Sequence, residues 1–140
     1  MREVANVVIL IFLVVLAILD WKNKEIPVLL LLLMSVAVAI FAVVCPTENV
    51  RSCMAGASVG LLFFVISKVT KEAVGYGDGW LILLLGVFLG GLRVLQILFA
   101  ASIFSAVCSL FYLWKCHWKR TESIPFVPFL TIAYIGVLLL

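Results

Sequence analysis

Aspartate occurs only twice in this chain of 140 residues, as Asp20 and Asp78. Both adjoin apolar segments, in a sequence that is 66% hydrophobic and only 12% charged. An ionisable side chain at membrane depth is costly, and such residues are by default candidates for function. Two neighbouring carboxyl groups do not both ionise at low cost, so one holds a proton while the other acts as a base. The pair therefore predicts acid–base chemistry such as the activation of a water molecule.

The two aspartates also fit structural roles. Asp20 is placed to cap a helix or to pair with Lys22 or Lys24, and Asp78 is placed to pair with Lys71. A small transporter or proton-relay protein would likewise use isolated acids in its membrane helices. A relay requires acids spread in depth along a path, whereas catalysis requires them at one level. The position of each aspartate along its helix therefore distinguishes these functions.

The composition identifies the elements that must position these acids. Soluble domains are about half apolar and about a quarter charged, so this chain requires a bilayer as solvent for much of its surface. We predict a single all-α domain, residues 1–140, with six transmembrane helices. The net charge of +3 is too small to indicate a nucleic-acid partner. The six apolar runs are 4–19, 26–45, 53–67, 80–92, 94–114 and 126–140.

Lysine and arginine predict the orientation of the helices. The segments 20–25, 68–79 and 115–123, which fall on one side of six crossings, carry seven of the ten basic residues. The other side carries Arg2, Arg51 and Arg93. Basic residues favour the cytoplasmic side, so both termini are predicted outside and both aspartates at the cytoplasmic face. The fourth run is too short to span unless residues 75–79 enter the membrane with it.

The sequence around each aspartate adds detail. Asp78 lies in Gly75-Tyr76-Gly77-Asp78-Gly79, where glycines permit unusual backbone shapes and close approach of a peptide. Asp20 is followed by Lys22 and then by Ile26-Pro27, which is typical of a helix start. Gly56 and Gly60, like Gly86 and Gly90, have the four-residue spacing of helix contacts. Cys45 and Cys53 flank a short polar loop. This spacing is compatible with a disulfide and equally with two unpaired thiols.

Three motifs together carry a resemblance to the type IV prepilin peptidases. The segment from Gly75 to Asp78 resembles the GxGD signature of intramembrane aspartyl proteases. Asp20, Lys22 and Ile26-Pro27 resemble the first catalytic segment of prepilin peptidases. Pro125-Phe126-Val127-Pro128-Phe129 is similar to the segment that opens their last helix. The motifs follow the family's order, and the chain resembles the short, core-only form of tight-adherence pilus systems.

The resemblance implies an aspartic endopeptidase without metal or cofactor, in which Asp20 and Asp78 are catalytic. The substrates implied are prepilin-like proteins with a basic leader, a glycine before the cut and an apolar helix after it. The archaeal preflagellin peptidases are an alternative within the same group. Two positions depart from the family pattern, Val28 where asparagine is frequent and Trp80 where lysine is frequent. The residues expected to shape the site or bind substrate are Gly75, Tyr76, Gly77, Lys22, Ile26, Pro27, Pro125, Phe126 and Pro128.

Overall fold

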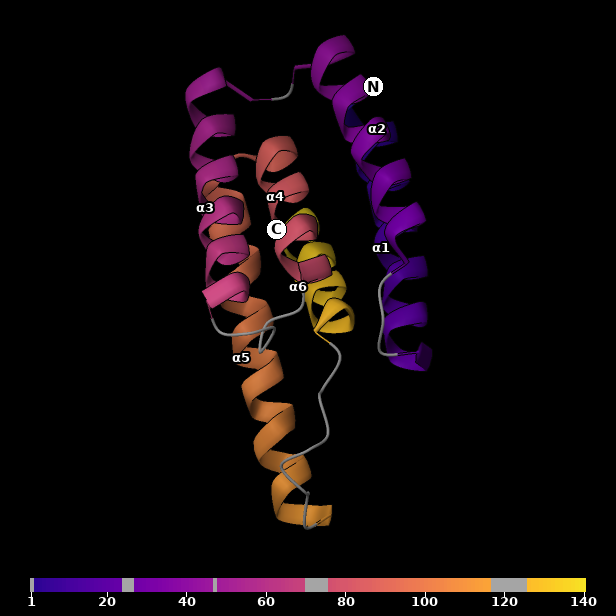
Figure 1. The fold of residues 1–140 in the computed structure, drawn as a ribbon, viewed down its shortest axis with the longest axis vertical. Helices are drawn as coiled ribbons and strands as arrows, with labels where there is room; N and C mark the ends of the chain where they lie inside the picture. Colours follow the sequence, from indigo (N-terminus) through magenta and orange to yellow (C-terminus); the bar gives the residue numbers. More distant parts are fainter. Residues whose placement is uncertain (1, 24–26, 47, 70–75, 117–125) are drawn as a thin grey trace.

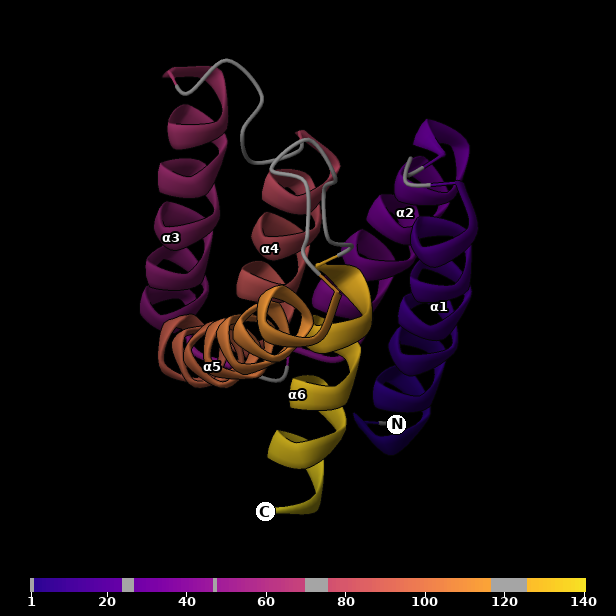
Figure 2. The ribbon, with the colours of Figure 1, turned by 90° about the horizontal axis from the view of Figure 1, so that it is seen from below.

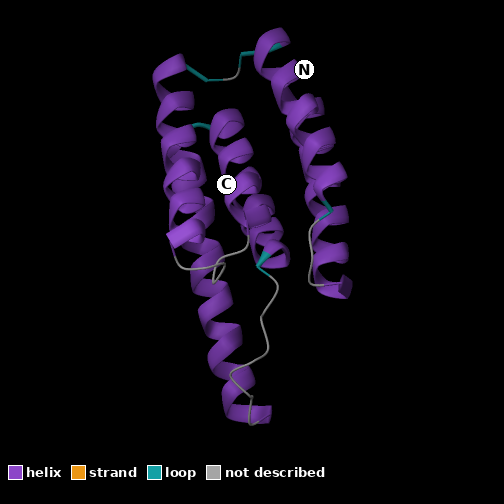
Figure 3. Cartoon of the chain, viewed as in Figure 1, coloured by secondary structure: helices purple, strands orange, loops and turns teal. Residues whose placement is uncertain are grey.

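The computed structural model describes residues 2–23, 27–46, 48–69, 76–116 and 126–140, without the side chain of Cys116 (Figure 1). Within these ranges the chain is helical and the connections are loops (Figure 3), which confirms the all-α fold class. Purely apolar sequence favours helices because a helix satisfies its own backbone hydrogen bonds in lipid. The helices are α1 (Arg2–Asn23), α2 (Val28–Val44), α3 (Val50–Val69), α4 (Tyr76–Leu89), α5 (Gly91–Cys116) and α6 (Val127–Leu139).

The helices differ in their ability to cross a bilayer. α1, α3 and α5 have the length and apolarity of membrane spans, so the chain is an integral membrane protein. α2, α4 and α6 are apolar but shorter, with 17, 14 and 13 residues. At about 1.5 Å per residue, α4 is about 21 Å long, against a hydrocarbon core of about 30 Å. As expected, α4 takes in part of the segment before residue 80, because it begins at Tyr76 and includes Asp78.

The six helices form a ring of neighbours. In order around the ring, α1 packs on α2, α2 on α4, α4 on α3, α3 on α5, α5 on α6, and α6 on α1; α4 also contacts α5. Figure 2 shows α4 between α3 and α2, and α6 between α5 and α1. The C-terminal half of α5 extends beyond the other helices (Figure 1), and its described side chains after Ala101 are exposed or half-buried. α4 is the most buried helix of the ring, so Asp78 belongs to its central element.

α3 and α4 share the most extensive interface, and glycine explains how close they are. The backbone of Gly56 touches the backbone of Gly86, so a methyl group at either position would overlap with the facing helix. A methyl group at Gly60 would overlap with the backbone of Leu83. Small residues at four-residue spacing permit this approach in membrane proteins. The predicted packing role is therefore confirmed for Gly56, Gly60 and Gly86.

Gly90 also packs closely on α3, as predicted, because a methyl group there would overlap with the Ser52 side chain. It separates α4 from α5 with a φ of +84°, a left-handed conformation that glycine adopts readily. The predicted boundary at Arg93 is therefore wrong by three residues, and Arg93 lies in the first turn of α5. There it lies 3.7 Å from Glu48, which is also 3.9 Å from Arg2. These half-exposed ion pairs connect the start of α1 to the start of α5.

Two buried hydroxyls on α6 lead to opposite expectations. Thr131 Oγ1 donates to Val127 O at 2.9 Å and lies 3.3 Å from Leu13 O of α1, whereas the Tyr134 hydroxyl has no partner among the described residues. An unmade hydrogen bond costs about 1–3 kcal/mol, and a made one stabilises by about 1 kcal/mol. We expect Tyr134→Phe to raise the free energy of unfolding by about 1 kcal/mol, and Thr131→Val to lower it. Thermal unfolding in detergent measures both, and a destabilised Tyr134→Phe variant would contradict the first expectation.

Candidate active site

Asp20 lies on the inward face of α1. The buried positions of this helix are Ala5, Ile9, Leu13, Leu16 and Asp20, which recur every three or four residues and therefore form one stripe. Asp20 is only 7% exposed. Its burial on the core stripe means that the acid faces the other helices and not the surrounding lipid.

The first turn of α6 provides the described hydrogen-bond partner of Asp20. The backbone N–H of Val127 donates to Asp20 Oδ2 at 3.3 Å. Val127 is the first residue of α6, and N–H groups at a helix start lack partners within their own helix. Asp20 therefore caps α6 from 107 positions away in the sequence. A capping role was one of the structural alternatives, and the other carboxylate oxygen, Oδ1, is left for further contacts.

Asp78 lies in the first turn of α4, on the face that carries the buried side chains of Leu81, Ile82 and Leu85. It is half-buried, and its carboxylate has a repulsive electrostatic interaction with that of Asp20. The two acids of the sequence, 58 positions apart, are thus neighbours at one end of the helix ring. This proximity supports chemistry that uses the pair and does not fit acids spread in depth along a relay.

The glycines of the Asp78 motif provide space and not unusual backbone shapes. Gly77 and Gly79 lie in the regular helix α4, and among the described glycines only Gly90 has a positive φ. The expectation of an unusual backbone shape is therefore wrong for Gly77; Gly75 lies outside the described residues. A side chain at Gly79 would lie 3.2 Å from the Cα of Phe64 in α3. Gly79 thus lets the turn that carries Asp78 pack closely on α3.

The remaining predicted residues that the structure describes lie at the helix ends near the two acids. The Tyr76 ring packs on Phe64 with a centroid distance of 5.7 Å, and Pro27 precedes α2, where its carbonyl accepts from Leu30 N–H and Leu31 N–H. Phe126 is the N-cap residue of α6. Lys22 and Pro128 border the same shallow apolar groove between α1 and α6. Ile26 and Pro125 lie outside the described residues.

Alternative partners for the acids are few in the described ranges. The ion pairs there join Glu48 to Arg2 and Arg93, and Lys22 forms none with Asp20. Lys24 and Lys71 fall outside the described residues. No group of three or more histidine, cysteine or acidic side chains that could hold a metal ion occurs in the described part of the chain. Cys45 and Cys53 are free thiols, which corresponds to the unpaired alternative.

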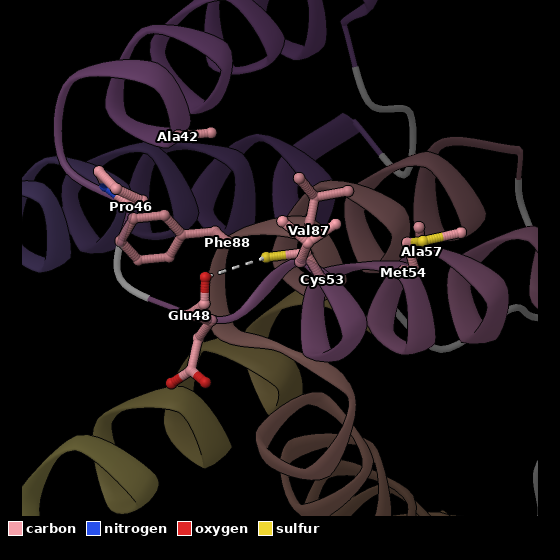
Figure 4. Close-up of a pocket in the computed structure, with 9 residues that line it drawn as sticks. Ala42, Pro46, Glu48, Cys53, Met54, Ala57, Val87 and Phe88 are labelled. Carbon is pink, nitrogen blue, oxygen red and sulfur yellow. Dashed lines mark hydrogen bonds between the residues drawn. The ribbon is translucent and has the colours of Figure 1, made fainter.

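A cavity at the opposite end of the ring contains none of the predicted residues. It has a volume of about 300 Å³ and lies between α2, α3 and α4, with Phe88 and Val87 on one side. Figure 4 shows the Glu48 carboxylate turned away from its neighbours, while the Glu48 backbone oxygen lies 4.0 Å from Cys53 Sγ. No pair of acids lines this cavity, so it does not compete with the Asp20–Asp78 region as the reactive centre.

Sequence reasoning missed three features of this region: the bond from Val127 to Asp20, the packing of Phe64 on Gly79, and a hydrogen bond from Trp80 Nε1 to Ser35 Oγ at 3.1 Å. Each joins residues from different helices. Gly79 gave a usable signal, because small residues in membrane helices often lie where another helix packs closely. The other two have no local signature.

Comparison with known proteins agrees with the motifs. No solved structure matches the chain. The prepilin leader peptidase/N-methyltransferase of Haemophilus influenzae is 32% identical over 100 residues, which are 68% of this chain and 40% of that protein. The protein of the same name from Burkholderia pseudomallei is 32% identical over 88 residues, 59% of this chain and 28% of that protein. Thus the match spans less than half the length of either relative.

A comparison with protein families covers a larger part of the chain. Residues 7–110 match the type IV leader peptidase family, a range that includes both Asp20 and Asp78. The Pro125–Phe129 segment lies outside the matched range, although its helix contacts Asp20. Because the match covers most of the sequence, the chain belongs to the type IV leader peptidase family.

Proposed function

We propose that this chain is an intramembrane aspartic endopeptidase that removes the leader of type IV prepilin-like proteins. The observation that carries the proposal is the placement of the two acids, Asp20 on the buried face at the end of α1 and Asp78 in the first turn of α4, near enough for their charges to interact. Membership of the family and the names of the relatives support the same reaction. The acids lie at one level of the helix ring, which favours hydrolysis over a transporter that relays protons.

The chemistry requires one proton shared by two carboxyl groups. One aspartate takes a proton from a water molecule, whose oxygen attacks the scissile carbonyl carbon, while the other donates its proton to the carbonyl oxygen. When the tetrahedral intermediate collapses, the C–N bond breaks and the amide nitrogen receives a proton. The bond from Val127 N–H fixes the orientation of Asp20, so a backbone group of α6 acts as a positioning element.

The substrate class is the one that membership of the family implies, and it fits the level proposed for the two acids. A prepilin-like protein has a basic leader in the cytoplasm, a glycine before the cut and an apolar helix in the bilayer. Its scissile bond therefore lies near the cytoplasmic interface. The acids would reach that level from α1, in its last turns, and from α4, in its first turn. Seven of the ten basic residues lie in the segments that connect the helices at this same end. Such a concentration is typical of cytoplasmic loops.

Topology provides one test of the proposal. We expect six crossings, with both termini outside and the 115–123 segment in the cytoplasm. Reporter fusions after Leu140 and within 115–123 measure this directly. α4 and α6 have 14 and 13 residues, so their crossing depends on local thinning of the bilayer or on flanking residues. An external 115–123 segment would contradict six crossings and the cytoplasmic position of Asp78.

The decisive experiment is co-expression with candidate prepilins from the same genome, followed by mass determination of the new N-termini. We expect cleavage directly after a glycine at the boundary between the basic leader and the apolar helix. Cleavage of preflagellin-like substrates alone would indicate the archaeal type of enzyme. Proton transport by the purified chain in vesicles, without cleavage of any substrate, would instead support the transporter function.

A further inference from the structure

A large cavity with a polar lining lies at the end of the helix ring opposite to the two aspartates. Its volume is about 860 Å³, in the upper part of the range of ligand pockets. It lies between the first turns of α1 and α5 and the last turns of α6, the helix that separates α1 from α5 (Figure 2). The proposed acid–base chemistry uses none of its residues. Its polar lining residues are Arg2, Glu3, Asn6, Arg93, Gln96 and Tyr134.

Arg2 and Arg93 reach this cavity from two helices that are not neighbours in the ring. Both guanidinium groups lie near the same oxygen, Glu48 Oε1, at 3.9 and 3.7 Å. These contacts are longer than hydrogen bonds and involve one nitrogen of each guanidinium group, so N–H donors of both arginines remain available. The lining carries one acid, Glu3, against the two arginines. Because arginine donors match the oxygens of phosphate in pairs, this end of the cavity is suited to a phosphate group.

Tyr134 provides a second, independent polar group. It is fully buried in the wall that α6 contributes, and its hydroxyl has no hydrogen-bond partner among the described residues. Buried polar atoms in proteins are nearly always hydrogen-bonded, and an exception calls for an explanation. A ligand oxygen in the cavity would accept the bond that the protein leaves unmade. Tyr134 lies five residues before Leu139, the last residue of α6, and is therefore about 7 Å deeper than the helix end.

The rest of the lining is apolar and extends away from the arginines. On α5, Arg93 and Gln96 are followed by Ile97 and Ala100, which lie about 6 and 10 Å further along the helix than Arg93. On α6, the lining is apolar apart from Tyr134. Since α5 has the length and apolarity of a membrane span, its start lies at the level of lipid headgroups and its next turns at the level of acyl chains. A free phosphate ion matches the arginines alone, whereas a phospholipid matches the whole lining.

We propose that this cavity is a binding site for one phospholipid of the surrounding bilayer. The lipid phosphate accepts hydrogen bonds from Arg2 and Arg93, an ester oxygen accepts one from Tyr134, and an acyl chain lies along Ile97 and Ala100. A lipid bound in this way ties the start of α1 to the start of α5, on either side of α6. The site is independent of the proposed proteolysis, because it uses neither of the two aspartates.

The test measures the unfolding midpoint of the full chain, delipidated and in detergent, as a ligand is added. The probe is dioleoyl phosphatidylglycerol. The comparison ligands are dioleoylglycerol, which has the same chains without phosphate, and inorganic phosphate. A ligand that binds the folded state alone raises the midpoint, and we expect the phospholipid to raise it by about 5 °C or more at saturation. Either comparison ligand should raise it by less than about 2 °C.

Arginine variants test the phosphate contacts. Arg2→Gln and Arg93→Gln should each reduce the rise in midpoint by at least about half, because each removes charge-assisted hydrogen bonds to the phosphate. Arg51→Gln is the matched control, since Arg51 is an exposed arginine in the first turn of α3 and does not line the cavity. It should keep the full rise. A loss in Arg51→Gln as large as that in Arg2→Gln would reduce the effect to surface charge and overturn the site.

Tyr134→Phe covers the case in which an arginine variant fails to fold. This variant loses an unpartnered hydroxyl, so without lipid it is expected to be more stable than the unaltered chain. With the phospholipid its midpoint should rise less, so that the lipid narrows or reverses the difference between the two proteins. An equal rise in both proteins would contradict the contact from Tyr134 to the lipid.

The comparison ligands separate a phospholipid from the alternatives. No rise with the phospholipid overturns the site outright. An equal rise with dioleoylglycerol would mean that the acyl chains alone bind, and a full rise with inorganic phosphate would mean that the cavity holds a free anion; either result overturns the proposal. A rise that requires both phosphate and chains, and that is weakened in the Arg2, Arg93 and Tyr134 variants but not in Arg51→Gln, supports it.

Discussion

Asp20→Asn and Asp78→Asn are each expected to reduce cleavage of a prepilin substrate by at least about 100-fold, because a positioned acid or base contributes about 10²–10⁴-fold. The amide keeps the shape of the side chain but does not exchange protons. At position 20 it also keeps an oxygen that can accept the Val127 N–H, so the contact between α1 and α6 is retained. Initial rates with purified protein in detergent measure the effect.

The matched control is Glu3→Gln, another change of acid to amide, on an exposed residue in the first turn of α1. It is expected to leave the rate unchanged. Thermal unfolding of all three variants should resemble that of the unaltered chain. Substantial cleavage by either aspartate variant would exclude a mechanism that depends on both acids.

Gly56→Val is expected to have the largest effect on stability. The added side chain would overlap with the backbone of Gly86, which cannot move aside as a flexible side chain can. Overpacking of a core usually costs about 1–3 kcal/mol, and a backbone-to-backbone contact offers less relief. We therefore expect a loss of at least about 3 kcal/mol, with separation of α3 from α4 and loss of activity.

Gly136→Val provides the control, because a Cβ added there has no atom of another helix within 4 Å. Its unfolding midpoint in detergent should stay close to that of the unaltered chain. If Gly56→Val unfolds at the same temperature as Gly136→Val, the close contact between α3 and α4 is not important for stability.

The sequence predicted the features that depend on composition and local motifs. The all-α class followed from the apolar runs, and the pairing of the two acids followed from their rarity and from their places in the runs. Helix ends were less predictable. Arg93 was taken as the break before α5, whereas the break is at Gly90, because a left-handed glycine and not a charge ends α4.

Contacts between distant segments were beyond prediction. The bond from Val127 N–H to Asp20 depends on how α6 packs against α1, and the bond from Trp80 to Ser35 depends on how α4 packs against α2. Neither hydrogen bond has a local sequence motif, because many other backbone N–H groups or serine hydroxyls could have formed an equivalent bond.

The interfaces of the ring are unequal, and this bears on how a substrate of the proposed peptidase would enter. α3 and α4 are joined backbone to backbone through their glycines, whereas α1 and α6 are joined by Thr131 and by the Asp20 carboxylate. Each of these two helix pairs carries one of the acids. Under the proposed mechanism, a motion that parted the pairs to admit a peptide would also part the acids, so cleavage would require the pairs to close around the substrate.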